Sequence, residues 1–218
     1  GVENVQGAGL SRDLRCQAVP ITLSLENRET LVVELDGTLL RSDVLYECCW
    51  WAFSRDWRVP CRAASALAQG RAALKVRLAE AVILEPGKLP YDPDVISYIN
   101  TWRSRGGRTA LVTASDQSVA RAVADHLGMF DEVHGSNGSL NLKGEQKAAF
   151  LEQRFGSKQF AYMGDATADL PVWKRAAKAI TVNAPAALRR EAERVADVVE
   201  HLTTASNSAT PYIKALRP

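Results

Sequence analysis

The sequence predicts an α/β fold built around a doubly wound parallel sheet. Short apolar segments typical of buried strands alternate with longer segments of helical periodicity between residues 31 and 199. Glycines at positions 106, 107, 128 and 156 follow the helical segments, where helices commonly end. Strands that alternate with helices in this way favour a parallel sheet with helices on both faces.

The predicted elements follow one another with short connections. We expect strands at residues 31–35, 109–113, 131–134, 160–163, 179–182 and 197–199. We expect helices at residues 93–105, 117–127, 145–155, 170–177 and 185–194. Sheets of this kind bind ligands at the carboxyl ends of their strands. Polar residues at predicted strand ends, namely Glu34, Thr113 and Asp165, are therefore expected to lie in one crevice.

The remaining segments suggest the organisation of the chain. Residues 1–28 read as a polar tail, in which residues 21–25 could form an edge strand. Residues 40–89 carry apolar residues at helical spacing and no strand pattern, which predicts a small helical insertion. The core is then formed by residues 29–39 and 90–200, and residues 201–218 are expected to be a linker.

Composition is that of an ordinary soluble protein. Of 218 residues, 46% are hydrophobic and 24% charged, and the net charge of +2 gives no electrostatic case for a nucleic-acid partner. The four cysteines form no Cys-x-x-Cys pair, so we expect free thiols in a reducing cytoplasm. The sequence shows no signal peptide and no long apolar segment. Because it begins with Gly1 rather than Met, we expect an expressed or trimmed fragment.

Four motifs occur in a fixed order. Residues 34–38 read Glu-x-Asp-Gly-Thr after an apolar strand, and residues 111–115 form a second strand that ends in hydroxyl residues. Lys147 opens a helix, and residues 164–169 read Gly-Asp-x-x-x-Asp after another strand. This order resembles the haloacid dehalogenase (HAD) superfamily of phosphatases and phosphoryl-transfer enzymes, over roughly residues 30–199. The resemblance implies a HAD fold, Rossmann-like, in which the helical insertion at residues 40–89 is a cap after the first strand.

The resemblance also implies catalytic roles. The first acid of the family's first motif is the aspartate that accepts the phosphoryl group, and here that position is held by Glu34. Asp36 matches the acid that protonates the leaving group and later activates water. Thr113 and Lys147 match residues that hold the phosphate.

Binding roles follow from the same resemblance. Phosphate is expected to be bound by Gly37, Thr113, Ala114 and Lys147. Gly37 would let the backbone turn so that amides face the phosphate. The resemblance implies a Mg²⁺ cofactor with a metal site formed by Glu34, the carbonyl of Asp36, Asp165 and Asp169. Carboxylates, a carbonyl and waters are the ligands that Mg²⁺ prefers.

Glu34 leaves three interpretations open. Its extra methylene moves the carboxylate by about 1.5 Å if extended, and a misplacement of about 1 Å can lower a rate about a hundredfold. Glutamate could still work as the nucleophile, or it could support metal and phosphate binding without efficient turnover. The change could also have been engineered to trap a state.

Other positions have simpler alternatives. Thr113 could merely end its strand, and Asp169 could serve as the N-cap of the next helix. Lys143 competes with Lys147, which we prefer because it opens a helix with Lys-x-x-x-Leu, the family pattern. The three histidines are scattered and receive no role.

The predicted cap is rich in aromatic and basic residues. Trp50 and Trp51 could pack cap helices together or form an apolar wall for a lipidic or aromatic substrate. Arg71, Lys75 and Arg77 could form a solvated face or meet a phosphate.

Residues 212–218 carry a further resemblance. Their pattern Tyr-Ile-x-x-Leu-Arg-Pro is similar to the segment before the first membrane helix of UbiA-type polyprenyl prenyltransferases, some of which carry an N-terminal HAD domain. The resemblance implies a domain tethered to the cytoplasmic face of the inner membrane, with a phosphorylated small-molecule or lipid-linked substrate.

The sequence thus favours a Mg²⁺-dependent phosphomonoester hydrolase, with a prenyl-linked sugar phosphate as one candidate substrate and with turnover in doubt because of Glu34. The alternative is a catalytically silent phosphate-binding or regulatory domain of a membrane prenyltransferase. A phosphomutase or dehalogenase is less favoured, because nothing marks a second sugar-phosphate site or a halide pocket.

Overall fold

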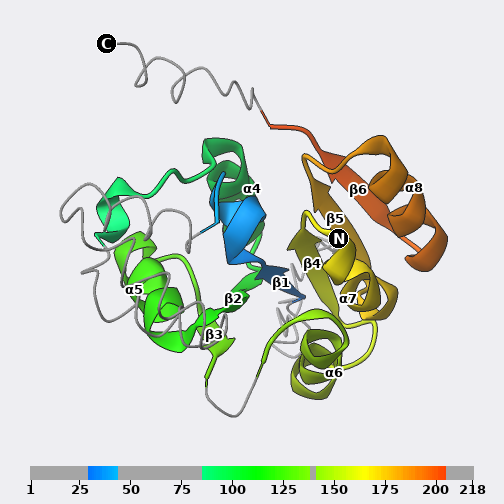
Figure 1. Ribbon diagram of the computed structural model, residues 1–218, viewed down its shortest axis with the longest axis horizontal. Helices are drawn as coiled ribbons and strands as arrows, with labels where there is room; N and C mark the ends of the chain where they lie inside the picture. The colour runs from blue at the N-terminus through cyan, green and yellow to red at the C-terminus, as the bar shows by residue number, and fades with distance from the viewer. Residues whose placement is uncertain (1–28, 44–84, 138–140, 205–218) are drawn as a thin grey trace, which may run out of the picture.

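Six parallel strands form the centre of the molecule (Figure 1). The structure, a computed structural model, describes residues 29–43, 85–137 and 141–204. The strands lie in the order β3-β2-β1-β4-β5-β6. They are β1 (Thr30–Val33), β2 (Arg108–Asp116), β3 (Glu132–Ser136), β4 (Phe160–Gly164), β5 (Lys178–Val182) and β6 (Val199–Leu202). The chain winds outward from β1 in both directions, which confirms the predicted doubly wound sheet and puts its switch point between β1 and β4.

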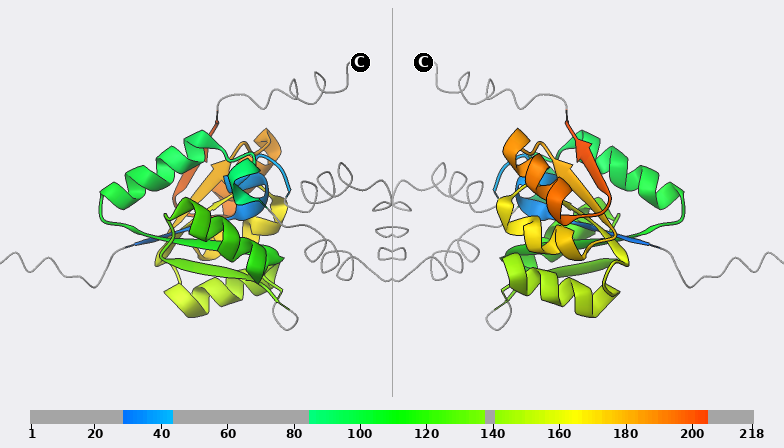
Figure 2. Two further views of the ribbon diagram at one scale, coloured as in Figure 1. Left: turned by 90° about the vertical axis from the view of Figure 1, so that its left-hand side faces the viewer. Right: turned by 90° about the vertical axis from the view of Figure 1, so that its right-hand side faces the viewer.

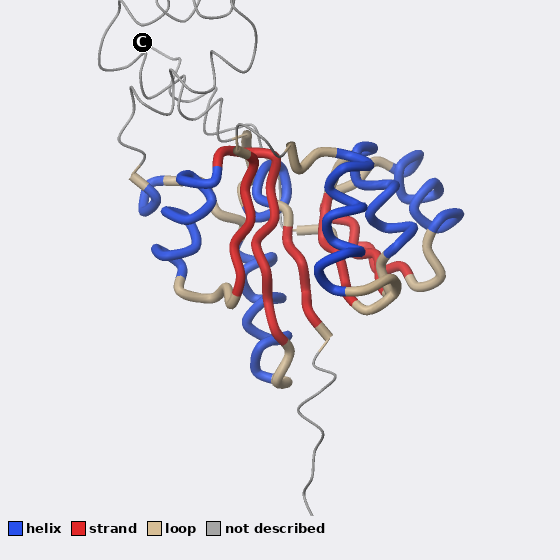
Figure 3. The backbone as a smooth tube through the Cα atoms, turned by 90° about the horizontal axis from the view of Figure 1, so that it is seen from below, coloured by secondary structure: helices blue, strands red, loops and turns tan. Residues whose placement is uncertain are grey.

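Helices cover both faces of this sheet (Figures 1 and 3). One face carries α4 (Pro93–Ser104) and α5 (Gln117–Leu127). The other carries α6 (Gly144–Phe155), α7 (Leu170–Arg175) and α8 (Ala186–Val195). The left-hand view of Figure 2 looks onto the first group and the right-hand view onto the second. The result is a three-layer α/β/α arrangement with an apolar cluster on each side of the sheet.

The central strand shows why the apolar segments read as continuous runs. Leu31 and Val33 point into the cluster under α4 and α5, whereas Val32 points into the cluster under α6, α7 and α8. All three are fully buried because both faces of a parallel sheet are covered. Val33 lies opposite Leu111 of β2 and Met163 of β4, so the last residue of β1 is level with these two positions of its neighbours.

Several strand ends differ from the prediction. β2 continues to Asp116 rather than ending at residue 113, and β3 continues to Ser136 rather than ending at residue 134. β1 ends at Val33 rather than at residue 35, because residues Leu35–Leu39 (η1) close a tight turn in which Gly37 has a φ of 74°. β6 runs from Val199 to Leu202, later than the expected 197–199, and so it passes the predicted core boundary at residue 200. Its pairing with β5 at every position explains the added length.

Several sequence predictions concern residues outside the described ranges. They are the tail, most of the cap with Trp50, Trp51, Arg71, Lys75 and Arg77, and the pattern at residues 212–218. Where the described chain borders the cap segment, Leu40 pairs with Tyr91 in an antiparallel bridge. A short helical turn, η2 (Pro86–Lys88), precedes that bridge.

Asp92 joins three parts of the fold at this junction. Its carboxylate is 1% exposed and accepts hydrogen bonds from the Asp94 amide at 3.0 Å, Arg41 Nε at 3.1 Å and Thr204 Oγ1 at 2.7 Å. Asp92 therefore serves as the N-cap of α4, and it also connects Arg41, just after η1, to Thr204, just after β6.

Removing this carboxylate should lower the free energy of unfolding more than removing an ordinary helix N-cap does. We expect Asp92→Ala to lower the free energy of unfolding by about 2–3 kcal/mol, because three donors lose their acceptor in a buried place. The matched control is Asp116→Ala at the exposed N-cap of α5, which should cost about 1 kcal/mol. Urea unfolding measures both values. Equal losses in the two variants would contradict the junction role of Asp92.

Candidate active site

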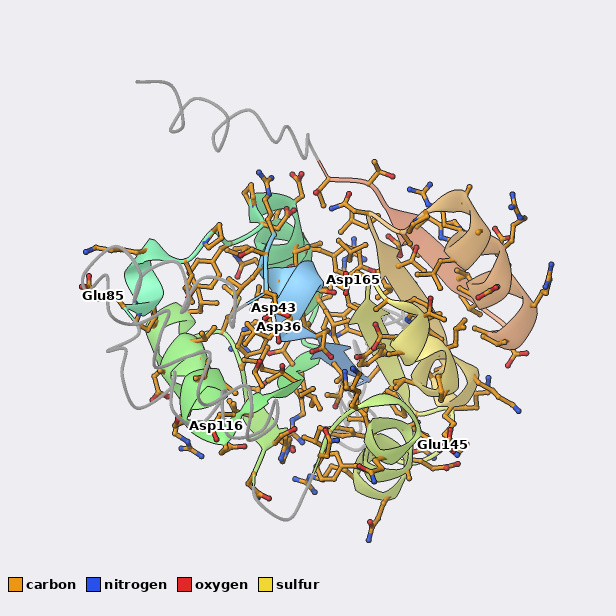
Figure 4. All side chains as sticks on the ribbon, viewed as in Figure 1. Asp36, Asp43, Glu85, Asp116, Glu145 and Asp165 are labelled. Atoms are coloured by element: carbon orange, nitrogen blue, oxygen red, sulfur yellow. The ribbon has the colours of Figure 1, made fainter. Side chains whose placement is uncertain are left out.

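The polar residues of the four motifs meet at the carboxyl edge of the three central strands. Glu34 follows β1, Thr113 lies in β2, and Asp165 follows β4. Lys147 reaches the same place from α6. In Figure 4, Asp36 and Asp165 lie near the middle of the molecule beside the β1–η1 segment, whereas Asp116 and Glu145 lie at its periphery. This is the switch point of the sheet, where such folds bind their ligands.

Gly37 allows η1 and Asp165 to come close together. A Cβ atom at Gly37 would lie 2.2 Å from Asp165 Oδ2, and the φ of 74° is one that other residues rarely adopt. The neighbouring Thr38 hydroxyl donates a hydrogen bond of 3.1 Å to Asp165 Oδ1. Gly37 is thus required by both the turn and the carboxylate packed against it, while its predicted contact with phosphate remains a prediction.

Asp36 is held by two hydroxyl residues of β2. Ser115 Oγ donates to Asp36 Oδ2 at 2.7 Å, and Thr113 Oγ1 lies 3.4 Å from the same oxygen. The Ser115 amide donates to Thr113 Oγ1 at 3.0 Å. β2 continues to Asp116, so Thr113 does not end the strand. Ser115 was missed as a site residue, although alternation along a strand puts it on the same face as Thr113.

Behind these groups lies a buried polar network. Lys147 Nζ makes an ion pair with Glu34 Oε2 and donates to the Tyr162 hydroxyl at 2.9 Å. The Tyr162 oxygen is 2.9 Å from Glu34 Oε2 and 2.8 Å from Asp169 Oδ1. Lys147 Nζ lies 3.6 Å from Asp169 Oδ1. Lys147 is 4% exposed, whereas Lys143 is exposed at the surface, so the structure brings only Lys147 to the site.

Asp169 does not play the simple capping role that its position suggested. Its side chain makes no capping bond to α7. Instead, Asp169 Oδ2 accepts hydrogen bonds from the amides of Asp165 and Ala166 at 3.2 and 3.1 Å. These bonds fix the loop that carries Asp165.

Burial and crowded carboxylates control the protonation of the site. Burial raises the pKa of Glu34 from 4.5 to about 7, although Lys147 acts in the opposite direction. Burial and the nearby Asp169 raise the pKa of Asp165 from 3.8 to about 6. Burial alone would lower the pKa of Lys147, but Glu34 and Asp169 outweigh it and raise that pKa. Burial also raises the pKa of Tyr162.

The donor chemistry of the site fits a divalent cation. The carboxylates of Glu34, Asp165 and Asp169 interact with the single ammonium group of Lys147, and Asp36 adds a further carboxylate beside Glu34 and Asp165, which leaves excess negative charge. Oxygen donors of this kind suit Mg²⁺. The Asp165 carboxylate and the backbone carbonyl of Asp36 are the groups that could hold the ion, while Glu34 and Asp169 are bound to Lys147 and Tyr162.

Among the described residues, no three or more His, Cys, Asp or Glu side chains are arranged closely enough to hold a metal ion. The four-residue Mg²⁺ set, like the phosphate contact of Ala114, therefore stays a prediction.

Comparison with known families agrees with this geometry. Residues 31–174, more than half of the chain, match the family of haloacid dehalogenase-like hydrolases. The chain therefore belongs to that family.

A relative among curated proteins is much longer than this chain. An uncharacterized protein of Sinorhizobium fredii, y4nM, is 43% identical over 152 residues, which are 70% of this chain and 29% of the relative. The chain thus spans under a third of that protein's length.

Solved structures show the same fold at low sequence identity. A protein of unknown function from Bordetella pertussis is 18% identical with a TM-score of 0.58, covering 80% of this chain and 99% of its own. A substrate-bound phosphoserine phosphatase is 14% identical with a TM-score of 0.55, covering 88% and 100%. A HAD family hydrolase of Salmonella enterica serovar Typhi is 11% identical with a TM-score of 0.57, covering 82% and 69%.

The raised pKa of Asp165 predicts a gain in stability when its charge is removed. A carboxyl group whose folded pKa exceeds its unfolded pKa favours the folded state at low pH, and that contribution is lost as pH rises from about 3.8 to about 6. In EDTA at pH 7.5, Asp165→Asn should therefore melt at a higher temperature than the unchanged protein. The difference should shrink below pH 4, as thermal unfolding followed by circular dichroism would show. A lower melting temperature for the variant at pH 7.5 would contradict this account.

Proposed function

We propose that the chain is a Mg²⁺-dependent phosphomonoester hydrolase. The observation that carries the proposal is the position of Asp36, whose carboxylate is held by Ser115 and Thr113 at the edge where Lys147 and Asp165 converge. An oriented carboxyl group, at a site that also contains a buried ammonium, is what a proton-transfer step on a phosphate ester requires.

The residues of the chain account for each part of the reaction. The Glu34 carboxylate would attack phosphorus while the bond to the ester oxygen breaks, and Asp36 would give its proton to that leaving oxygen. Asp36 would then take a proton from water as the water oxygen displaces the acyl oxygen of Glu34 from phosphorus. Lys147, with amides near Gly37 and Ala114, would hold the phosphoryl oxygens. Bound Mg²⁺ would supply neutralisation of the charge on those oxygens.

One observation favours a second candidate, a catalytically silent phosphate-binding domain. The Glu34 side chain is 8% exposed and engaged with Lys147, and it also lies within hydrogen-bond distance of Tyr162. A carboxylate paired with a buried ammonium must separate from that ammonium before it can reach a phosphorus atom. Slow hydrolysis follows from the first candidate and none from the second, so a rate measurement separates them.

We further propose a lipid-linked substrate, such as a prenyl-linked sugar phosphate, and a natural chain that continues into a membrane prenyltransferase. Support comes from the pattern at residues 212–218 and from the greater length of the Sinorhizobium fredii relative. No helix within the described ranges is long and apolar enough to cross a membrane. The domain would act on the cytoplasmic face of the inner membrane.

The coding sequence after Pro218 tests the fusion. Several long apolar segments in that sequence are expected. A stop codon shortly after residue 218 would remove the membrane proposal and leave the proposal of phosphate-ester hydrolysis intact.

The nucleophile position gives the sharpest test of hydrolysis. We expect Glu34→Asp to raise the rate of aryl phosphate hydrolysis by at least about tenfold, because a shorter side chain places the carboxylate as the reaction requires. Asp36→Asn should abolish hydrolysis in both backgrounds, and EDTA should do the same until Mg²⁺ is restored. Asp116→Asn, at an exposed helix cap, serves as the matched control and should leave the rate unchanged. Equal or lower activity of Glu34→Asp would show either a site adapted to glutamate or a domain that is no phosphatase.

A further inference from the structure

Tyr162 is a buried hydroxyl group without an assigned role. It lies in β4 and is fully buried in the cluster under α6, α7 and α8. Its oxygen meets Lys147 Nζ at 2.9 Å, Glu34 Oε2 at 2.9 Å and Asp169 Oδ1 at 2.8 Å. Each of these partners is itself at most 6% exposed. Water therefore cannot replace the hydroxyl without a rearrangement of the core.

The Tyr162 hydroxyl has a single proton to share between two carboxylates. The Tyr162 oxygen accepts one hydrogen bond from Lys147, and its single proton can be donated to only one carboxylate at a time. Asp169 Oδ2 also accepts from the amides of Asp165 and Ala166, so Asp169 stays fixed whichever way the proton points. The Tyr162 proton can thus turn toward Glu34 or toward Asp169 without breaking the two hydrogen bonds that fix the loop carrying Asp165.

The backbone also makes room for this ring. A Cβ atom at Gly164 would lie 2.9 Å from Tyr162 Cε1 and 2.5 Å from Asp169 Oδ2. Gly164 is followed at once by Asp165. The absence of a side chain at residue 164 therefore allows the phenol ring and the Asp169 carboxylate to pack beside the same stretch of backbone.

From this geometry we propose that Tyr162 is a positioning residue matched to Glu34. The proposal rests on the function proposed above and adds a partner for the longer nucleophile. The extra methylene of glutamate extends the carboxylate by about 1.5 Å relative to aspartate. The Tyr162 hydroxyl lies where the extended carboxylate ends, and together with Lys147 it fixes that carboxylate at the carboxyl edge of β1. An aspartate at position 34 would draw back from the hydroxyl and lose this contact.

A double-mutant cycle between Glu34→Asp and Tyr162→Phe tests the proposal. With Glu34 present, Tyr162→Phe should lower kcat for an aryl phosphate by about tenfold and leave KM nearly unchanged. In the Glu34→Asp background the same substitution should change kcat by less than about threefold. Tyr162→Phe should also lower the melting temperature by about 2–4 °C more when Glu34 is present.

Tyr98→Phe provides a matched control. The Tyr98 hydroxyl also lies between a glutamate and a lysine, Glu200 at 2.9 Å and Lys178 at 3.3 Å, away from the site. Its removal should lower stability equally in both backgrounds at position 34.

The outcomes separate the two proposals. Equal effects of Tyr162→Phe in both backgrounds, or loss of folding in both as seen by circular dichroism, would overturn the positioning role and make Tyr162 an ordinary core residue. If none of the variants hydrolyses phosphate esters in the presence of Mg²⁺, the proposed function fails, and the melting-temperature cycle alone decides whether Tyr162 holds Glu34.

Discussion

The ion pair between Lys147 and Glu34 is the interaction on which the rest of the site depends. Removing charged groups from water is costly, and such a pair persists only when further hydrogen bonds satisfy its remaining atoms. Tyr162 supplies such a partner for Lys147, and Asp169 adds a second negative charge. The central strand β1 presents Glu34 from one side and α6 presents Lys147 from the other, so the pair also joins two layers of the fold.

The carboxylates at the carboxyl edge of the sheet lower the stability of the fold, although the proposed reaction needs them. Asp165 is packed against Gly37, and burial together with the nearby Asp169 raises its pKa, so its ionised form destabilises the folded protein. Natural active sites commonly retain such unfavourable groups because function needs them. A cation bound between Asp36 and Asp165 would relieve this repulsion, so ligand binding and folding stability would be linked at this edge.

Much of the fold could be predicted because its signals are local. Helix α5 occupies the predicted residues 117–127, since a capping aspartate precedes it and Gly128 follows it in the left-handed conformation. The β1 end was misplaced because Leu35 is apolar and buried like a strand residue, although it already belongs to the turn.

The site was only partly predictable for a related reason. Motif order identified Asp36, Lys147 and Asp165, but the roles of Ser115 and Tyr162 arise from contacts between distant segments. Side-chain direction along a strand could have suggested Ser115. No sequence pattern could have placed the Tyr162 hydroxyl between two carboxylates that lie 128 residues before it and 7 residues after it.

The antiparallel bridge between Leu40 and Tyr91 has an evolutionary consequence. Residues 39–41 and 90–92 are hydrogen-bonded side by side, so the chain leaves and re-enters the core at one point. The closure entropy of a chain segment rises only slowly with its length, and a segment whose ends are already joined can change in length and sequence at small cost to the sheet. The segment between these anchors is thus free to diversify while Glu34, Asp36 and Lys147 keep their places. Related proteins can in this way share one core and differ in the substrates that reach its site.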